Sequence, residues 1–454
     1  MDNSITIGQP AIANVAATSP LTRLLRLFGD VRQGEAPVVL LLVANIFVTL
    51  AGYYVCKTVR EPLILISGGA AMKTYASAGQ ALLLMGFIPL YSWFASRVDR
   101  TRLLLGLSMF FIVNLELFWA VGHANVPNVG IAFYVWVGIF SNAVIAQFWS
   151  YGNDLFDKPT GERLFPIIAI GMTLGSPLGA AFAEALFARG AEPYALLQIV
   201  VVCLVGSIAL YWIVERRWKQ RSGRPAAPLR AGGNGFALLA TSPYLGTICL
   251  LLLVLNLVNT TGEFVLSSAV VERANQLAAS DPGFNKAAYI GAFYGNYFFW
   301  VNVGAVVLQS FVASRLVKRF GLGGVLFALP LVALGAYGAI AFGAGFAVVR
   351  LAKTAENATD YSIMNVARQM LWLPTSREEK YKAKQAADTF IVRAGDVLSA
   401  ILVWVGTTVL SLGPNGFAFA NLALVVVWLS LAYVLLRGYQ RRSLPPRSLD
   451  DRND

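Results

Sequence analysis

The chain has 454 residues, of which 57% are hydrophobic and only 13% are charged, and its mean hydropathy is +0.62. A soluble protein carries about 25% charged residues, so this chain has too little charge to cover a water-soluble surface. That balance excludes an ordinary soluble protein and makes the lipid bilayer the expected surroundings of most of the chain. The three cysteines and the single histidine lack zinc or disulfide-framework spacing, so no metal and no cofactor is expected.

A membrane-spanning helix needs about 20 predominantly apolar residues. Twelve segments satisfy this requirement in chain order, and they predict an all-α integral membrane protein with two pseudo-symmetric six-helix bundles. The predicted spans are 37–67, 74–95, 103–122, 129–155, 164–188, 194–215, 244–271, 288–313, 322–345, 346–373, 385–411 and 415–436.

The distribution of basic residues predicts the orientation of the chain. Of the 36 Lys and Arg residues, 26 lie in the tails and in loops that follow even-numbered spans, six lie inside spans, and four lie in the remaining loops: Lys73, Arg189, Arg273 and Lys286. Because cytoplasmic loops of membrane proteins are enriched in Lys and Arg, both termini are expected in the cytoplasm, of a bacterial inner membrane. The same distribution explains the net charge of +12, so nucleic-acid binding is not expected.

A basic, Pro- and Gly-rich segment divides the chain into two halves. The predicted domains are a tail (1–36), an N-terminal bundle (37–215), a cytoplasmic linker (216–243), a C-terminal bundle (244–436) and a second tail (437–454). Two short repeats support the duplication: Ala95–Val98 with Ala313–Leu316, and Thr58–Glu61 with Thr260–Glu263.

Charged residues inside spans are costly, so they usually face a protein interior or a water-filled cavity. In the first span, one helical arc of about 120° holds two tyrosines, two basic residues and an acid: Tyr53, Tyr54, Lys57, Arg60 and Glu61. Pro62 is expected to kink or break this span. We interpret the arc as a cationic patch beside aromatic faces that lines a pathway. The alternative is a helix end whose long side chains reach the headgroups.

The tenth span is the most polar, and its polar residues cover about half of the helical circumference. They are Arg350, Lys353, Asn357, Asp360, Tyr361, Asn365 and Arg368. This pattern favours a helix that lines a cavity, and the alternative is a helix that lies on the membrane surface.

The remaining intramembrane charges are candidates for coupling or for charge pairing. The acids are Asp154 in span four, Glu184 in span five, Glu263 in span seven, and Asp388 and Asp396 in span eleven, which also carries Arg393. Each acid could pair with a basic residue, or it could exchange protons in a proton-coupled carrier.

Two six-helix halves joined by a basic linker resemble the major facilitator superfamily. The repeats Ala95–Val98 and Ala313–Leu316 stand where that superfamily carries its loop motif, and Asp99-Arg100 matches the acidic–basic pair of the motif, although its glycines are missing. Gly171, Gly175 and Gly179 stand at four-residue spacing, which predicts close packing of helices. With Pro177, this stretch also resembles the span-five motif of antiporters in the superfamily. The resemblance implies a central site between the halves, alternating access by rocking, and exchange.

Several stretches together resemble the nucleotide transporters of the bacterial and plastid ATP/ADP exchanger family. They are Tyr53–Leu63 with its Tyr, Lys57 and Arg60-Glu61; Phe148-Trp149 with Asn153; Arg163–Pro166; Trp372–Pro374; and Lys384, Asp388, Arg393 and Gly395. The chain departs from the family at Asn365 and Arg368-Gln369, where the family has an aspartate and a Lys-Glu pair. It also departs at Gly395–Leu398, where the family has Gly-Lys-Ser-Gly and this chain places Asp396. These departures favour a less charged anion or a different exchange partner.

The leading hypothesis is a secondary transporter, functional as a monomer, that exchanges an anionic, phosphorylated metabolite such as a nucleotide. The basic residues Lys57, Arg60, Lys353, Arg368 and Arg393 would attract the anion and repel one another in the empty carrier, so that it cannot close. The alternative is a proton-coupled exporter of an amphipathic compound that uses Glu61, Glu184 or Glu263. An enzyme is not expected, because the chain lacks a His-rich metal set, a nucleophile elbow and a phosphate-binding loop.

Overall fold

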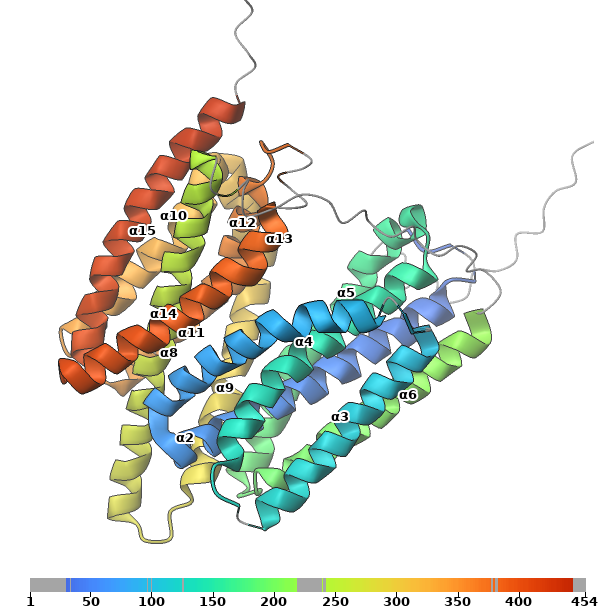
Figure 1. Ribbon diagram of the computed structural model, residues 1–454, viewed down its shortest axis with the longest axis horizontal. Helices are drawn as coiled ribbons and strands as arrows, with labels where there is room; N and C mark the ends of the chain where they lie inside the picture. The colour runs from blue at the N-terminus through green and yellow to red at the C-terminus, as the bar shows by residue number, and fades with distance from the viewer. Residues whose placement is uncertain are drawn as a thin grey trace, which may run out of the picture.

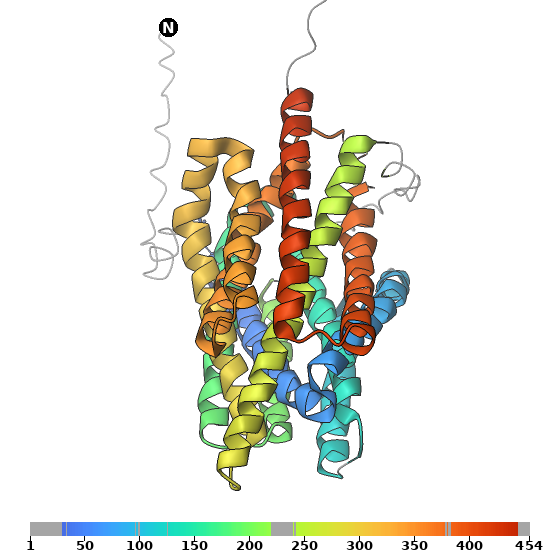
Figure 2. The ribbon, with the colours of Figure 1, turned by 90° about the vertical axis from the view of Figure 1, so that its left-hand side faces the viewer.

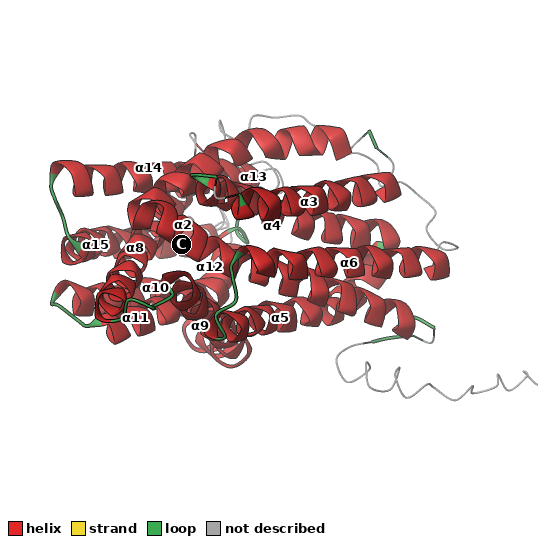
Figure 3. Ribbon diagram, turned by 90° about the horizontal axis from the view of Figure 1, so that it is seen from below, coloured by secondary structure: helices red, strands yellow, loops and turns green. Residues whose placement is uncertain are grey.

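The computed structural model describes residues 30–32, 34–95, 97–98, 100–124, 126–218, 239, 242–376, 379 and 383–443. Within these residues the chain is helical and has no strand (Figure 3). Most of the predicted linker and most of both predicted tails lie outside the described residues. The helices are α2 (Ala36–Ala95), α3 (Arg100–His123), α4 (Val129–Leu155), α5 (Lys158–Ala188), α6 (Leu197–Trp218), α8 (Pro243–Ser280), α9 (Lys286–Val307), α10 (Ser314–Ala341), α11 (Phe346–Thr359), α12 (Asn365–Leu371), α13 (Lys384–Ala386), α14 (Val392–Trp404) and α15 (Pro414–Ser443).

Short segments of other helix types connect several of these helices. One is a 3-10 turn before α6, η1 (Tyr194–Leu196). The others are π-helical and lie in the second half of the chain: η2 (Leu308–Ala313), η3 (Asp360–Met364), η5 (Ala387–Ile391) and η6 (Val405–Val409). Because a π-helical turn contains an extra residue, each segment rotates the side chains that follow it relative to a regular α-helix.

Nine stretches of helix in the described residues are long and apolar enough to cross a membrane. Two of them, Ala36–Ile88 and Lys286–Ala341, contain 53 and 56 residues. At 1.5 Å per residue each is about 80 Å long, which is enough for two crossings of a hydrocarbon core of about 30 Å. A multi-pass, all-helical membrane protein, as predicted, is therefore confirmed.

Each of the two long stretches bends at a glycine. α2 turns back on itself at Gly69, whose φ of 71° and ψ of −169° are non-helical, and α10 breaks at Gly321, with φ 59° and ψ −145°. A positive φ is easy only for glycine, which explains why the chain reverses at these residues. The break expected at Pro62 is wrong, because α2 is helical on both sides of that residue. Helices within membranes tolerate proline when neighbouring groups satisfy the freed backbone.

The helices form two bundles side by side (Figures 1 and 2). One contains α2 to α6 and the other contains α8 to α15. The start of α2, the start of α8 and the ends of α6 and α15 lie at one end of the molecule, which we call the basic end because Arg216, Arg217, Arg441 and Arg442 lie there. The Gly69 bend and the loop between α8 and α9 lie at the other end, which we call the turn end.

Glycines bring the helices of the first bundle together. A Cβ at Gly171, Gly175 or Gly179 of α5 would lie 2.3–2.5 Å from a backbone carbonyl oxygen of α2. Only glycine fits so close an approach, so the predicted role of this row in helix packing is confirmed.

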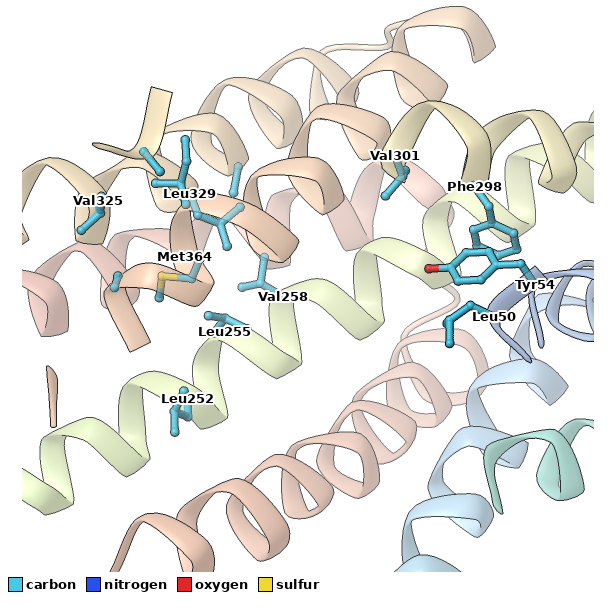
Figure 4. Close-up of a cluster of buried hydrophobic side chains, with 14 of the residues drawn as sticks. Leu50, Tyr54, Leu252, Leu255, Val258, Phe298, Val301, Val325, Leu329 and Met364 are labelled. Carbon is cyan, nitrogen blue, oxygen red and sulfur yellow. The ribbon is translucent and has the colours of Figure 1, made fainter. Parts of the chain in front are cut away.

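Close packing also joins the two bundles near the turn end. A Cβ at Gly295 of α9 would lie 2.8 Å from the backbone of Glu184 in α5, and one at Gly291 would lie 2.5 Å from the ring of Phe187. Aromatic rings also meet between the bundles (Figure 4): Tyr54 and Phe298 pack edge to face, with ring centroids 6.2 Å apart. α5 and α9 therefore hold the halves together at this end.

Candidate functional site

A cavity of about 160 Å³ lies between the two bundles. α2 supplies Lys57, Arg60, Glu61 and Lys73, and α8 supplies Asn259, Thr260 and Glu263. Single residues from other elements complete the lining: Tyr134 of α4, Phe298 of α9, Asn357 of α11 and Tyr361 of η3. Both halves of the chain therefore contribute charged and aromatic side chains to one site.

Lys73 links the carboxylates of the two halves. Its Nζ lies 2.7 Å from a Glu61 oxygen in its own bundle and 3.7 Å from a Glu263 oxygen in the other. It also donates hydrogen bonds to the hydroxyls of Ser267 (3.0 Å) and Tyr294 (3.4 Å) of the second bundle. A lysine that is only 6% exposed and contacts both bundles is part of the site itself.

The expectation that Lys73 lies in a loop is wrong. Lys73 follows Gly69 by four residues, so the sharp bend places it inside the second limb of α2. A basic residue that follows a turn of small residues resembles a loop sequence, so hydropathy alone could not assign Lys73 to a helix. The signal that could have found it is the Gly68-Gly69 pair, which marks a turn before Lys73.

Arg60 and Lys57 differ in their partners. Arg60 contacts a Glu61 oxygen at 2.8 Å, and its guanidinium carbon lies 4.3 Å from the ring centroid of Tyr134. Lys57 instead sits among aromatic rings, with Nζ 4.3 Å from the centroid of Phe298, 5.1 Å from that of Tyr54 and 6.0 Å from that of Tyr361. Cation–π contacts stabilise an ammonium less than an ion pair in a dry site does, so Lys57 remains available to an anion.

α11 supports the cavity from the second bundle. Asn357 donates hydrogen bonds to Glu263 (2.8 Å) and to the Tyr297 hydroxyl (2.7 Å), and its own Oδ1 is buried with no hydrogen-bond partner among the described residues. Lys353 is fully buried behind it, 3.0 Å from Glu356 and 3.9 Å from Glu263. Sequence reasoning missed Glu356, which the Tyr337 hydroxyl also contacts at 2.8 Å. Its three-residue spacing from Lys353 on the polar helix was the available signal.

The predicted site residues thus fall into two groups. The structure brings Lys57, Arg60, Glu61, Glu263 and Asn357 to the cavity, with Tyr54 and Lys353 directly behind it. Tyr53 lies against Tyr54, with ring centroids 5.2 Å apart.

The other predicted residues lie outside the lining of this cavity. Arg368 pairs with Asp360 at 3.0 Å and, with Asp388, lines a separate cavity of about 250 Å³ closer to the basic end. Arg393 pairs with Asp396 at 3.5 Å; Asp396 accepts a hydrogen bond from Asn256 (2.8 Å) and one from Thr260 (3.4 Å), which does line the central cavity. The last two of the predicted acids lie away from the central cavity.

Those two acids are Glu184 and Asp154. Glu184 accepts a hydrogen bond of 2.7 Å from Asn296, which in turn accepts one from Arg350, so the three residues tie α5 to α9 and α11. Asp154 is exposed near the end of α4. Neither residue is brought to the central cavity.

The charges of the lining nearly cancel. Three cations (Lys57, Arg60 and Lys73) face two carboxylates (Glu61 and Glu263), which leaves one net positive charge. Among the described residues, no group of three or more His, Cys, Asp and Glu residues could hold a metal ion. Chemically, the arrangement can bind an anion with the cations, accept a hydrogen-bond donor at Asn357, and stack a flat group on the aromatic rings.

Comparison with known proteins identifies distant relatives. No family model matches the chain. The "ADP,ATP carrier protein 1" of Chlamydia trachomatis is 23% identical over 350 residues, which cover 66% of this chain and 63% of the carrier. The protein of the same name from Chlamydia pneumoniae is 24% identical over 318 residues, 60% of this chain and 59% of the carrier. The chain thus matches less than two thirds of the length of these relatives.

Solved structures share the fold over nearly the whole chain. A bacterial homologue of the iron transporter ferroportin has a TM-score of 0.65 at 17% identity and covers 89% of this chain and 99% of its own. A bacterial homologue of the lysosomal transporter Spinster has a TM-score of 0.61 at 13% identity, with coverage of 92% and 100%. The nucleoside transporter NupG has a TM-score of 0.61 at 12% identity, with coverage of 89% and 99%.

These comparisons confirm two predictions. The chain has the fold of the major facilitator transporters, and in sequence it resembles a divergent relative of the bacterial ADP/ATP carriers. The relatives and structural neighbours described above are all transporters, and none is an enzyme.

Proposed function

We propose that this chain, with the fold of the major facilitator transporters and a distant resemblance to ADP/ATP carriers, is a secondary transporter that exchanges an anionic, phosphorylated metabolite. The observation that carries the proposal is the central cavity, where Lys57, Arg60 and Lys73 converge from one bundle opposite Glu263 and Asn357 of the other. Burying cations inside the membrane costs free energy, and binding of a transported anion would explain their presence there.

The charge balance favours a substrate with few negative charges. One net positive charge in the lining suits a single phosphate group, which carries about −1.5 to −2 at neutral pH, better than a triphosphate. The aromatic rings around Lys57 could stack on a nucleobase, and the free oxygen of Asn357 could accept a hydrogen bond from an amino or hydroxyl group. A nucleoside monophosphate or diphosphate therefore fits better than a triphosphate.

Exchange would follow from competition for Lys73. In the empty cavity the repulsion expected among the basic residues is offset by Glu61 and Glu263, and the Lys73–Glu263 pair joins the halves. A substrate phosphate that takes the place of Glu263 at Lys73 would break this connection and release the halves to move. The cavity of about 160 Å³ is smaller than the roughly 300–1,000 Å³ of typical ligand sites, so the substrate would enter as the halves separate.

The alternative is a proton-coupled exporter of an amphipathic compound. Both acids of the cavity lining, Glu61 and Glu263, already have cationic partners, and this pairing supports charge-driven exchange over proton carriage by either residue. The two functions differ in their dependence on an internal substrate. An exchanger needs a counter-substrate inside the vesicle, whereas a proton-coupled carrier needs a pH gradient.

The test is exchange in liposomes that contain the purified protein. Vesicles loaded with ADP are offered labelled AMP, ADP or ATP, and parallel vesicles are loaded with sugar phosphates. We expect uptake to require an anion inside the vesicles but no pH gradient. Uptake should be faster for AMP and ADP than for ATP. Uptake no greater than in protein-free liposomes for all of these compounds would overturn the proposal, and uptake driven by a pH gradient into empty vesicles would favour the exporter.

A further inference from the structure

A further cavity lies on the outer surface of the second bundle, where α8 begins and α15 ends. It has a volume of about 490 Å³ and is lined by Tyr244 and Thr247 of α8 and by Tyr433, Val434, Arg437 and Arg441 of α15, among others. The two helices lie side by side here in both Figure 1 and Figure 2. The transport proposal makes no use of this groove.

The groove changes from apolar to basic along α15. Arg437, Gly438 and Arg441 lie three, four and seven residues after Val434, so all four share one face of the helix. Val434 and Tyr433 are 54% and 48% exposed within a membrane-spanning helix, which means that this face meets lipid. The arginines follow toward the basic end, where the helix leaves the hydrocarbon.

Close packing shapes the floor of the groove. A Cβ at Gly438 would lie 3.0 Å from the ring of Tyr244, so glycine lets this ring approach α15. The Tyr244 hydroxyl donates a hydrogen bond of 2.7 Å to the carbonyl of Leu371, which fixes the ring. The groove therefore has one wall on each helix and a rigid aromatic surface between them.

Two of the three arginines of the groove have no carboxylate partner among the described residues. Within the described part of the chain, Arg442 pairs with Glu379 at 3.5 Å and donates to the Ser242 hydroxyl at 3.0 Å, while Arg437 and Arg441 form no ion pair. The guanidinium carbon of Arg437 lies 4.5 Å from the ring centroid of Tyr433. Arg437 and Arg441 are one helical turn apart, about 5.4 Å, so both can contact the oxygens of one phosphate.

We propose that this groove between α8 and α15 binds an anionic phospholipid, with its phosphate at Arg437 and Arg441 and an acyl chain along Val434. The order of chemistry along the groove matches the order in a lipid, from apolar chain to charged headgroup. Basic pockets between membrane-spanning helices commonly hold such headgroups. The proposal does not depend on the transported substrate, because none of these residues lines the central cavity.

The simpler explanation is that the arginines only orient α15 in the membrane. The two explanations can be distinguished by removing matched pairs of charges from the full-length protein. Arg437→Gln with Arg441→Gln removes two charges from the groove, and Lys318→Gln with Arg319→Gln removes two exposed charges from the same end outside it. Each protein is reconstituted in phosphatidylcholine with and without phosphatidylglycerol.

The measurements are the thermal unfolding midpoint and the number of phosphatidylglycerol molecules retained in native mass spectrometry. We expect phosphatidylglycerol to stabilise the unmodified protein and the Lys318/Arg319 variant, and its affinity to fall roughly fivefold for each groove arginine removed. Arg441→Gln alone keeps the test valid if the double variant does not fold. Equal lipid retention by both double variants would overturn the proposal. Equal stabilisation by inorganic phosphate in phosphatidylcholine would replace the lipid with a free anion and also overturn it.

Discussion

At the scale of single residues, two carboxylates at corresponding places in the halves share one lysine. Glu61 ends the first copy of the short repeat and Glu263 ends the second, and both oxygens face Lys73. Lys57 and Asn259 also stand at corresponding positions, four residues before each glutamate, and both line the cavity. The site is thus built from matching stretches of two helices, with Lys73 as the element that breaks the symmetry.

Lys73→Gln should abolish exchange. The substitution removes the cation that Glu61 and Glu263 share, and breaking a buried pair by removal of one partner costs about 3–5 kcal/mol. We expect a large drop in the thermal midpoint and no exchange in liposomes. Adding Glu263→Gln should recover the stability but not the exchange, since the substrate still lacks Lys73. Wild-type exchange by Lys73→Gln would show that Lys73 neither binds the substrate nor joins the halves.

Arg60→Lys tests whether the geometry of the guanidinium matters. Lysine retains the charge but not the planar fork that can hold two phosphate oxygens, so KM should rise about 10- to 100-fold with little loss of stability. Arg393→Lys is the matched control, because Arg393 lies outside the cavity lining. Equal changes in KM for the two variants would place the anion site elsewhere.

Several lining residues belong to polar arcs that are visible in the sequence. Lys57, Arg60, Glu61 and Asn357 lie on arcs of regular helices, and the structure brings them to the cavity. Arg368 and Arg393 follow η3 and η5, where a regular helical arc no longer holds, and they lie outside the lining. A π-helical segment depends on tertiary contacts, so a single sequence gives little sign of it.

At the scale of helices, the approach of α5 to α9 closes the turn end. Gly295→Ala would place a methyl group 2.8 Å from the backbone of Glu184, so one helix must move. We expect the substitution to destabilise this closed arrangement and to raise labelling of a cysteine introduced at Ser77, which lines the central cavity. Gly338→Ala in α10 is the control, since nothing lies within 4 Å of its Cβ position. Unchanged labelling in Gly295→Ala would mean that α5 and α9 separate without cost.

A second contact between helices joins the starts of α2 and α5. Arg163 donates to Glu35 at 2.9 Å, and the Arg32 amide donates to it at 2.8 Å. Partial burial alone would raise the pKa of Glu35, but these hydrogen bonds hold the pKa below its ordinary value of 4.5. The ionised Glu35 carboxylate therefore stabilises the folded protein at pH values above its ordinary pKa of 4.5. This stabilisation is lost as the pH falls through the lower pKa of the folded state.

Glu35→Gln should therefore flatten the acid side of the stability profile. We expect the thermal midpoint of the unmodified protein to fall more than that of the variant between about pH 5 and pH 3. Asp154→Asn, which removes an exposed carboxylate at the same end, is the control. Parallel profiles for Glu35→Gln and the unmodified protein would contradict the role of this pair.

The packing of α5 and the reversal of the chain between the predicted spans 37–67 and 74–95 were predictable, whereas the helical continuation of α2 through Pro62 was not. The glycine row of α5 is visible at four-residue spacing, and it packs against α2 as expected. Pro62 is the stronger helix breaker by composition, but the bend occurs at Gly69. The difference is physical: a proline removes one hydrogen bond, whereas a reversal needs a positive φ, which glycine adopts freely.

At the scale of the whole molecule, each bundle is held together by a buried polar contact between its first and last helices. In the first bundle Asn45 donates to the carbonyl of Ser207 at 2.9 Å, which joins α2 to α6. In the second, Thr261 donates to Asn421 at 2.5 Å, which joins α8 to α15. These contacts favour movement of each bundle as a unit.

Cross-linking tests this movement. In a background in which Cys56, Cys203 and Cys249 are replaced, cysteines at Glu184 and Asn296 join the bundles, and cysteines at Asn45 and Ser207 join two helices of one bundle. A short bifunctional reagent should abolish exchange in the first protein and leave it largely intact in the second. Full exchange by the cross-linked Glu184/Asn296 protein would contradict rocking of the halves about the cavity.

The bend at Gly69 also bears on how the protein enters the membrane during synthesis. It places Lys73 beside Glu61, so the first hairpin carries both partners of a 2.7 Å ion pair. A lone charge at the middle of a bilayer costs about 2.5–3.5 kcal/mol on insertion scales, and a partner in the same hairpin reduces that cost. The hairpin can therefore leave the translocation machinery with its one carboxylate already paired, before the second half of the chain, with Glu263, has been made.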